Sequence, residues 1–235
     1  MILDCDLLIG RDIAVGSTLN PAALTGRLKQ AGIAGGAVAS LRALLYNARS
    51  GNEETSLAVS ENAWLPVWGI DLRDPLGAQT EIEQAAARGI RLVRIAPGRQ
   101  GIAPTAPRLR LLVASAVANG ITILIEGSTA DTASSLMGLG ASVVFLDQHF
   151  YDLGEFIMVA REEAGFHLST RLLGSPGAWE LVAAEVGAER LVFGSRAGWF
   201  EEQAVLHRLA TAQLTDAERT LVAEGNLRRL GGEYS

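Results

Sequence analysis

Charged side chains that could transfer protons or bind ions lie within or directly after several short apolar runs of this sequence. Asp4 and Asp6 lie in the first run, and Glu126 ends the run ITILIE at 121–126. A carboxylate can hold a proton or a cation, and an arginine can bind a carboxylate or an anionic ligand through two parallel hydrogen bonds. Other candidates in similar positions are Arg94, Arg99, Asp147, His149, Thr170, Arg171, Ser195 and Arg196. If the runs end at one place, these residues form a site suited to proton transfer or anion binding.

The apolar runs have the character of parallel strands that are buried on both faces. ITILI at 121–125 and SVVFL at 142–146 are continuously or nearly continuously apolar rather than alternating. This pattern is typical of strands that helices cover on both sides. The predicted strands are Ile2–Leu8, Ile33–Ser40, Leu65–Ile70, Arg91–Ile95, Ile121–Glu126, Val143–Leu146, Phe166–Thr170 and Arg190–Phe193.

Amphipathic segments that begin with a cap and end with glycine separate several of these strands. Asn20-Pro21 begins one such segment, which ends at Gly32. Asparagine is a common helix N-cap, and proline is favoured at the first helical position. Similar segments run over 74–89, 107–120, 128–140 and 175–187. The recurring order of cap, helix, glycine and strand predicts βα units along the whole chain.

Eight strands with intervening helices predict one α/β domain over residues 1–235, folded as a (β/α)₈ TIM barrel. An open, doubly wound sheet is the alternative. Neither a GxGxxG after an early strand nor a GxxxxGK[ST] is present, which disfavours the nucleotide-binding versions of that alternative. In a TIM barrel the C-terminal ends of the strands carry the function, so the charged residues named above should meet at one face.

The composition excludes several classes of protein. Of the 235 residues 49% are hydrophobic and 20% are charged, which is ordinary for a globular domain. The net charge of −6 and the absence of a basic arm argue against nucleic-acid binding. A single cysteine allows no disulfide within the chain and indicates a reducing compartment. With no signal-peptide pattern and no apolar run of ~20 residues, we expect a cytoplasmic protein without a membrane partner.

Several segments resemble the amidohydrolase-2 group of the amidohydrolase superfamily, which are TIM-barrel metal-dependent hydrolases and decarboxylases. LDCDLLIG at 3–10 is similar to the group's first-strand motif I-D-x-H-x-H-x-G, and GAERLVFGSRAG at 187–198 is similar to GaeRllfGSDyP. The tail LTDAERTLVAEGNLRRLGG at 214–232 resembles the group's C-terminal segment, and 31–40, 89–98 and 118–127 resemble its second, fourth and fifth strands. The resemblance implies hydrolysis of a C–N, C–O or lactone bond, or decarboxylation of a small organic acid.

The same resemblance shows where this chain departs from the group's metal site. The group holds its metal with both first-strand histidines, a fifth-strand histidine and an eighth-strand aspartate. Asp6, Leu8, Glu126 and Arg196 stand at these positions. Leucine has no lone pair, arginine does not coordinate metals in practice, and a catalytic zinc site needs three protein ligands. Although zinc or another divalent metal is the group's norm, we expect no metal ligands and no cofactor here. A weak oxygen-ligated Mg²⁺ or Ca²⁺ site stays open.

The candidates for catalysis are Asp6, Glu126, His149 and Arg196. We expect Arg196 to bridge Asp6 and Glu126 in the electrostatic role of the metal. Two acids and one base leave one negative charge in excess, which could attract a cation or keep one carboxyl protonated. The alternative is a structural network of ion pairs without chemistry.

The candidates for substrate binding are Arg94, Asp147, Arg171 and Trp199, with solvated arginines and ordinary packing of the tryptophan as alternatives. Asp147 and His149 both fit the sixth-strand position of the resemblance, because the spacing allows either register. A histidine there could act as a general base or could be an ordinary loop residue. Strand alternation predicts that Cys5 faces away from Asp6 as a buried thiol rather than a nucleophile.

Two functions therefore remain open. One is a hydrolase or decarboxylase that acts on a small organic acid or amide without tightly bound zinc. The other is a catalytically inactive barrel that binds a small-molecule ligand or a partner subunit. Apolar positions on the outer helices would allow a homodimer, and likeness of fold alone does not decide between these functions.

Overall fold

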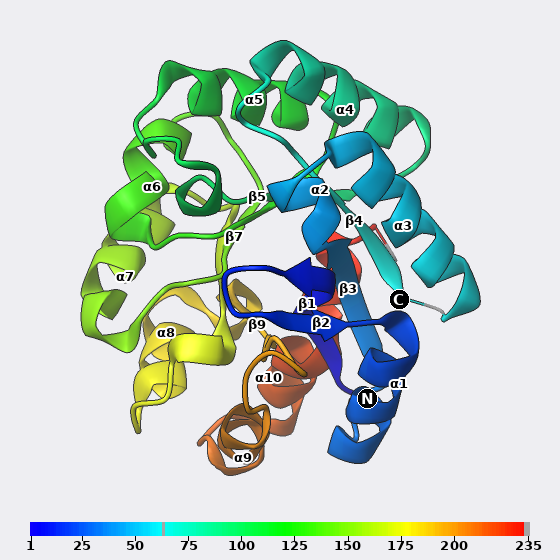
Figure 1. The fold of residues 1–235 in the computed structure, drawn as a ribbon. Helices are drawn as coiled ribbons and strands as arrows, with labels where there is room; N and C mark the ends of the chain where they lie inside the picture. The colour runs from blue at the N-terminus through cyan, green and yellow to red at the C-terminus, as the bar shows by residue number, and fades with distance from the viewer. Residues whose placement is uncertain (63, 233–235) are drawn as a thin grey trace.

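The computed structural model describes residues 1–62 and 64–232. Its centre is a curled nine-stranded sheet in the order β2-β1-β3-β4-β5-β6-β7-β8-β9, with helices around its outer side (Figure 1). β2 is antiparallel to β1, and every other neighbouring pair of strands is parallel. The strands are β1 (Leu3–Asp12), β2 (Ser17–Leu19), β3 (Gly35–Ser40), β4 (Leu65–Gly69), β5 (Leu92–Ile95), β6 (Thr122–Ile125), β7 (Val143–Phe145), β8 (Phe166–Ser169) and β9 (Leu191–Val192).

Helices follow most strands, as expected for βα units. The α-helices are α1 (Pro21–Ala31), α2 (Leu41–Leu45), α3 (Ala48–Glu61), α4 (Pro75–Ala87), α5 (Pro107–Ala118), α6 (Thr129–Leu136), α7 (Leu153–Glu162), α8 (Ala178–Val186), α9 (Gln203–Thr211), α10 (Asp216–Thr220) and α11 (Asn226–Leu230). Short 3₁₀ segments at Gly98–Gln100, Phe150–Asp152 and Thr170–Leu172 follow β5, β7 and β8. Within the described ranges, no helix is long and apolar enough to cross a membrane.

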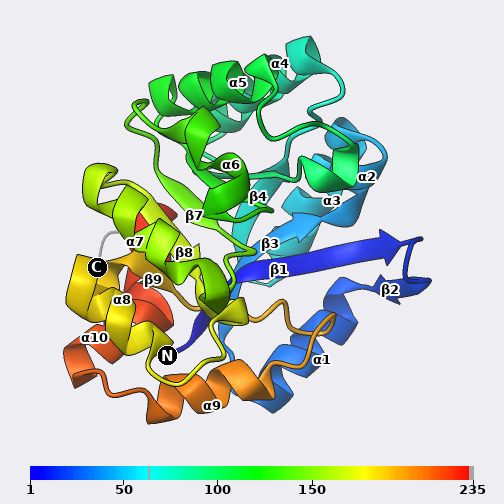
Figure 2. The same ribbon diagram turned by 90° about the vertical axis from the view of Figure 1, so that its left-hand side faces the viewer.

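The parallel sheet covered by helices confirms the coarse prediction of an α/β fold, and each of the eight predicted strands overlaps an observed parallel strand. The predicted end of the first strand at Leu8 is wrong. β1 continues to Asp12 and turns into β2, and this hairpin projects from the body of the molecule (Figure 2). The strand end was predicted from the end of the apolar run. An exposed two-stranded ribbon does not need apolar residues, so this criterion could not detect it. The amide N–H of Cys5 donates to the carbonyl of Phe193, just after β9, at 2.8 Å.

A register shift in β1 places the first acidic residues. It lies between Asp4 and Leu7, where the pairing with β3 is interrupted. The N–H of Asp6 donates to Oδ1 of Asp4 (2.8 Å), and so the carboxylate replaces a missing strand partner. The shift also breaks the alternation from which we placed Cys5 away from Asp6. Cys5 is nevertheless buried, as predicted, and packs in an apolar cluster with Leu8, where burial raises the pKa of its thiol.

Gly36 allows β1 and β3 to approach closely beside this shift. A Cβ at Gly36 would lie 1.9 Å from the carbonyl oxygen of Asp4, which is backbone and cannot move without moving the strand. We expect Gly36→Ala to lower the free energy of unfolding by about 2 kcal/mol, measured by urea denaturation. Gly26→Ala on the exposed face of α1 is the matched control, because a Cβ there meets nothing within 4 Å. An equal effect of both substitutions would contradict this explanation.

Candidate functional site

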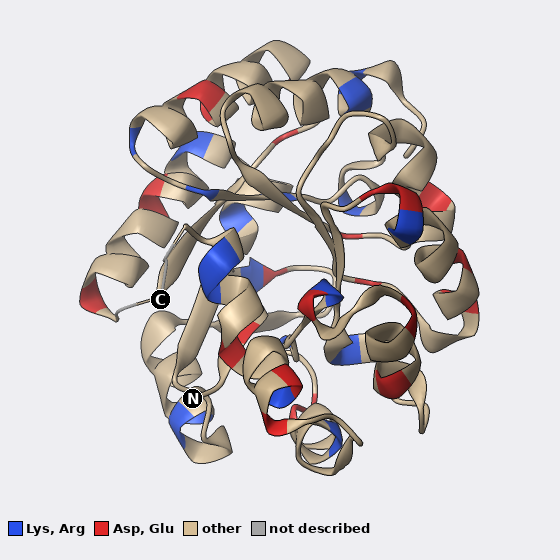
Figure 3. Ribbon diagram, turned by 180° about the vertical axis from the view of Figure 1, so that it is seen from behind, with Lys and Arg blue, Asp and Glu red and all other residues tan. Residues whose placement is uncertain are grey.

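The predicted site residues come from the C-terminal ends of the strands. Asp6 lies in β1 and Arg94 in β5, whereas Glu126 directly follows β6. Asp147, Arg171 and Arg196 follow β7, β8 and β9. Elsewhere, acidic and basic residues are interspersed along the helices and loops of the ribbon (Figure 3).

Asp6 lies at the centre of a cluster of arginines. Its Oδ1 accepts from Nη1 of Arg94 (2.8 Å), and its Oδ2 accepts from Nε of Arg196 (2.9 Å) and Nε of Arg171 (3.3 Å). The four side chains are almost completely buried. Burial alone would raise the pKa of Asp6, but the three guanidinium groups hold it below its usual value. Asp6 is therefore an anion that organises three cations.

Glu126 is bound by Arg94 and Arg99, whereas we expected it to be bound by Arg196. Its Oε1 accepts from Nε (2.9 Å) and Nη2 (2.6 Å) of Arg94, and its Oε2 accepts from Nε of Arg99 (2.6 Å). Burial opposes its ionisation, yet Arg94, Arg196 and Arg99 together lower its pKa to about 2. The prediction that Arg196 bridges Asp6 and Glu126 is thus wrong. Arg94 makes that bridge, because it lies on β5 between the two acids.

Arg196 instead joins Asp6 to Asp147, with Nη2 of Arg196 at 3.3 Å from Oδ1 of Asp147. Its backbone has a φ of 55°, and it is the only non-glycine residue with positive φ among those described. Side chains other than glycine rarely adopt this conformation, and it is often found at functional sites. Asp6, Glu126 and Asp147 together raise the pKa of Arg196 even though its burial acts in the opposite direction.

The charges of the cluster balance, contrary to the expected excess of negative charge. Arg99 also donates to Oδ2 of Asp12 (2.9 Å), the last residue of β1 before the hairpin turn. The ion pairs therefore join four arginines, Arg94, Arg99, Arg171 and Arg196, to four carboxylates, Asp6, Asp12, Glu126 and Asp147. Sequence reasoning missed Asp12, because it lies beyond the predicted end of its strand.

The structure brings Asp147, rather than His149, into the cluster. Asp147 pairs with Arg171 and Arg196, and its side chain is 29% exposed. Burial raises the pKa of Asp147 in spite of Arg196 and Arg171, with Asp6 acting in the same direction as burial. His149 stacks on Tyr151 at 4.6 Å, and its buried Nδ1 has no partner in the described part of the chain.

Two cavities open on either side of Arg99 and Arg196. A cavity of about 330 Å³ has apolar walls that include Leu8, Leu41 and Trp199, and Asp12 also lines it. A cavity of about 620 Å³ is lined by Glu126 and Asp147 among others. Both Arg99 and Arg196 line both cavities. Each volume is sufficient for a small organic molecule.

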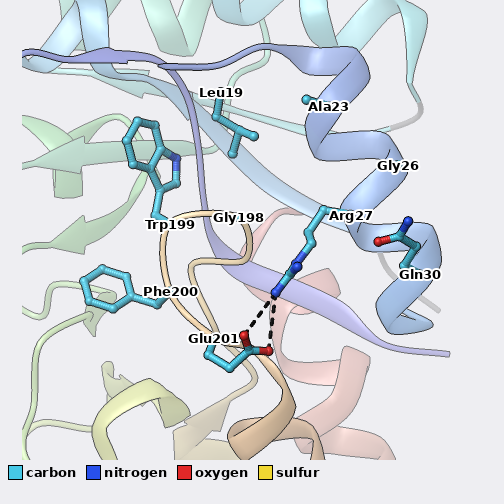
Figure 4. A pocket seen from close by; sticks show the side chains of 9 residues that line it. All are labelled: Leu19, Ala23, Gly26, Arg27, Gln30, Gly198, Trp199, Phe200 and Glu201. Carbon is cyan, nitrogen blue, oxygen red and sulfur yellow. Dashed lines mark hydrogen bonds and ion pairs between the residues drawn. The ribbon is translucent and has the colours of Figure 1, made fainter. Parts of the chain in front are cut away.

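Trp199, at the wall of the smaller cavity, is fixed by a hydrogen bond from Nε1 to the carbonyl of Leu8 (2.9 Å). Trp199 and Phe200 also line an outer groove of about 570 Å³ against α1, where Arg27 pairs with Glu201 (Figure 4). The ring of Phe200 lies 5.0 Å from the guanidinium of Arg171 and gives that cation an aromatic neighbour. Sequence reasoning did not single out Phe200.

Comparisons with known proteins agree with the fold. No family model matches the chain, and no curated protein matches it. A dihydroxybenzoic acid decarboxylase from Polaromonas, solved with bound manganese and the inhibitor 2-nitroresorcinol, has 13% identity and a TM-score of 0.79, over 98% of this chain and 96% of that one. A 5-carboxyvanillate decarboxylase from Sphingomonas paucimobilis has 13% identity and a TM-score of 0.74, over 99% of both chains. An uncharacterized TIM-barrel protein from Bordetella bronchiseptica has 18% identity and a TM-score of 0.77, over 99% and 98%.

The chain therefore shares its fold with these two decarboxylases and with a protein described as a TIM barrel. This likeness of fold agrees with the fold that the resemblance to the amidohydrolase-2 group implied. At such low identity the likeness carries no residue roles, so the function must be argued from the site itself.

The expectation that no cofactor is used is corrected by the same comparison. The Polaromonas decarboxylase holds manganese, and so a divalent metal has to be considered for this fold. The side chains at the expected metal positions do not fit one, however. Within residues 1–62 and 64–232 no group of three or more His, Cys, Asp or Glu side chains is placed to hold a metal ion. The oxygens of Asp6 already accept from three arginines, whose positive charges oppose the binding of a cation there.

Proposed function

We propose that this chain is a decarboxylase or hydrolase of small organic acids, built as one (β/α)₈ barrel over residues 1–235. The acid would bind at the C-terminal ends of the strands, with its carboxylate against Arg99 and Arg196. The names of the structural neighbours support the reaction class, since two of them are decarboxylases of aromatic acids. The single, buried cysteine is consistent with a cytoplasmic location.

Unused hydrogen-bond donors on two arginines carry this proposal. Arg99 donates through Nε and Nη1, and Arg196 donates through Nε and Nη2. Nη2 of Arg99 and Nη1 of Arg196 have no protein partner among the described residues, and both side chains line both cavities. A guanidinium edge with free N–H groups matches the two oxygens of a carboxylate.

Asp147 is the proton carrier in this proposal. It lines the larger cavity, remains partly exposed, and has a pKa that burial raises above its usual value, which favours its protonated form. In decarboxylation the carbon–carboxylate bond breaks, its electron pair stays on the substrate carbon, and that carbon takes the proton of Asp147 as carbon dioxide leaves. Water then returns a proton to Asp147. Arg171 and Arg196 position the carboxyl group of Asp147.

A ligand-binding barrel without turnover is the second candidate function. The balance of four carboxylates against four arginines supports it, since a network of ion pairs can be purely structural. Both candidates predict binding of a carboxylate, whereas only the first predicts loss of carbon dioxide or hydrolysis.

The test is to titrate the protein with 2,6-dihydroxybenzoate and with resorcinol, which lacks the carboxylate, in a calorimeter. We expect the acid to bind at least about tenfold more tightly, and Arg99→Gln to remove most of this difference. Arg42→Gln is the matched control, because Arg42 is exposed and lies outside both cavities. Carbon dioxide release, with and without added MnCl₂, separates the two candidates. Equal affinity for the two ligands would overturn the carboxylate site.

A further inference from the structure

Another cavity with buried polar groups lies between α3 and α4, on the outer side of the sheet. It has a volume of about 440 Å³ and shares no lining residue with the two cavities at the strand ends. Trp68 of β4 and Asn52 of α3 line it, together with Thr80, Glu81 and Gln84 of α4 and the following Arg88. Nothing in the proposed function uses this region.

Both polar atoms of the Asn52 side chain have hydrogen-bond partners. Its Oδ1 accepts from the N–H of Gly69 (2.8 Å), and its Nδ2 donates to the carbonyl of Gly69 (3.1 Å) and to Oε2 of Glu81 (3.0 Å). These bonds join α3 and α4 to the last residue of β4. The polar lining of the cavity is therefore fixed in place by the fold rather than by a flexible side chain.

Trp68 is the exception in this lining. Its side chain is only 3% exposed, and its Nε1 has no hydrogen-bond partner within the described ranges. A buried donor without an acceptor typically costs about 1–3 kcal/mol and is uncommon in folded proteins. A ligand that brings an oxygen acceptor into the cavity would remove this cost.

The charges around the cavity indicate the sign of that ligand. The guanidinium carbon of Arg88 lies 5.2 Å from the centre of the Trp68 ring, and Arg88 has no carboxylate partner among the residues described. Of the nearby acids, Glu53 pairs with Arg49 at 3.5 Å, and the carboxylate of Glu81 keeps its charge but is held by the amide of Asn52. Arg88 and the buried N–H of Trp68 lie together at the ring, and a cation beside an N–H donor matches an oxyanion.

We propose that this cavity is a second ligand site, which binds a small oxyanion through Arg88 and Nε1 of Trp68. The exposed side chain of Arg88 lies over the indole ring of Trp68. It would pair with an anion bound beside that ring. A carboxylate and a phosphate share this chemistry, and the volume leaves room for a small organic body attached to either.

Nuclear magnetic resonance of the indole N–H groups tests this site directly. The chain has four tryptophans, so four indole signals are expected, and Trp68→Phe assigns one of them. Sodium acetate and sodium phosphate are titrated separately at millimolar concentrations against sodium chloride of equal ionic strength. We expect a saturable shift of the Trp68 signal with at least one of the two anions, and the anion that acts identifies the chemistry. A shift no larger than with chloride for both anions would overturn the site.

Two arginine variants separate a built site from general attraction of anions. Arg88→Gln is expected to weaken the binding constant by about tenfold or more, because it removes the unpaired cation. Arg49→Gln removes the same charge from the same cavity, but from a residue that already pairs with Glu53, and it is expected to change binding less than about twofold. Equal losses in both variants would contradict the proposal. Both residues are exposed, so both variants should fold.

Discussion

Asp6→Asn is expected to lower the free energy of unfolding by about 3–5 kcal/mol at neutral pH. Asparagine has the shape of aspartate but carries no charge. The substitution therefore leaves Arg94, Arg171 and Arg196 side by side, almost completely buried, without the anion that they share. Removing one partner of a buried ion pair is costly because the remaining charges stay desolvated. Urea denaturation followed by circular dichroism gives the measurement.

Asp147→Asn is the matched control for this prediction. Asp147 pairs with two of the same arginines, but its side chain is 29% exposed, so water can solvate the charges that remain. We expect its loss to cost about 1 kcal/mol or less. If Asp6→Asn proved as mild as the control, the arginine cluster would not depend on a central anion, and the organising role given to Asp6 would have to be abandoned.

The strands could be predicted because burial on both faces leaves a direct trace in the sequence. ITILI and SVVFL can only be buried, and β6 and β7 lie within these runs. Residues 10–19 leave no such trace, because the hairpin of β1 and β2 gains its order from backbone pairing and projects from the body of the molecule. The register shift after Asp4 was equally hidden, since it depends on a side chain that replaces a strand hydrogen bond.

The gathering of Asp6, Glu126 and Arg196 could also be predicted, because parallel strands end at one edge. Which arginine contacts which acid could not. Arg94 reaches Glu126 from the neighbouring strand β5 and also reaches Asp6 on β1, which is not adjacent to β5. The side chain of Arg196, on a left-handed backbone, contacts Asp6 and Asp147. Such pairings depend on side-chain direction in three dimensions, and the order of residues along the chain does not encode it.

Two buried groups are expected to give opposite pH dependences of stability that nearly cancel in the wild-type protein. Burial raises the pKa of Asp4 from 3.8 to about 6, against the hydrogen bond from Ser195. Its contribution to stability is complete below pH 4 and is lost as the pH rises through 6. Burial lowers the pKa of His167 from 6.5 to about 4, assisted by Arg190. Its contribution is complete above pH 6.5 and is lost as the pH falls through 4.

Single substitutions should therefore reveal two opposite slopes between pH 4 and pH 6.5. In Asp4→Asn only the histidine term remains, and the free energy of unfolding should rise with pH by about 3 kcal/mol. In His167→Gln only the aspartate term remains, and it should fall with pH by about 3 kcal/mol. Urea denaturation at half-unit pH steps measures both curves, and each variant is compared with wild type at every pH, so that other titrating groups such as Asp147 cancel. Parallel curves for the two variants would show that neither burial perturbs the titration. Asparagine can still accept the N–H groups of Asp6 and Ser195, so a flat Asp4→Asn curve cannot be attributed to loss of those bonds.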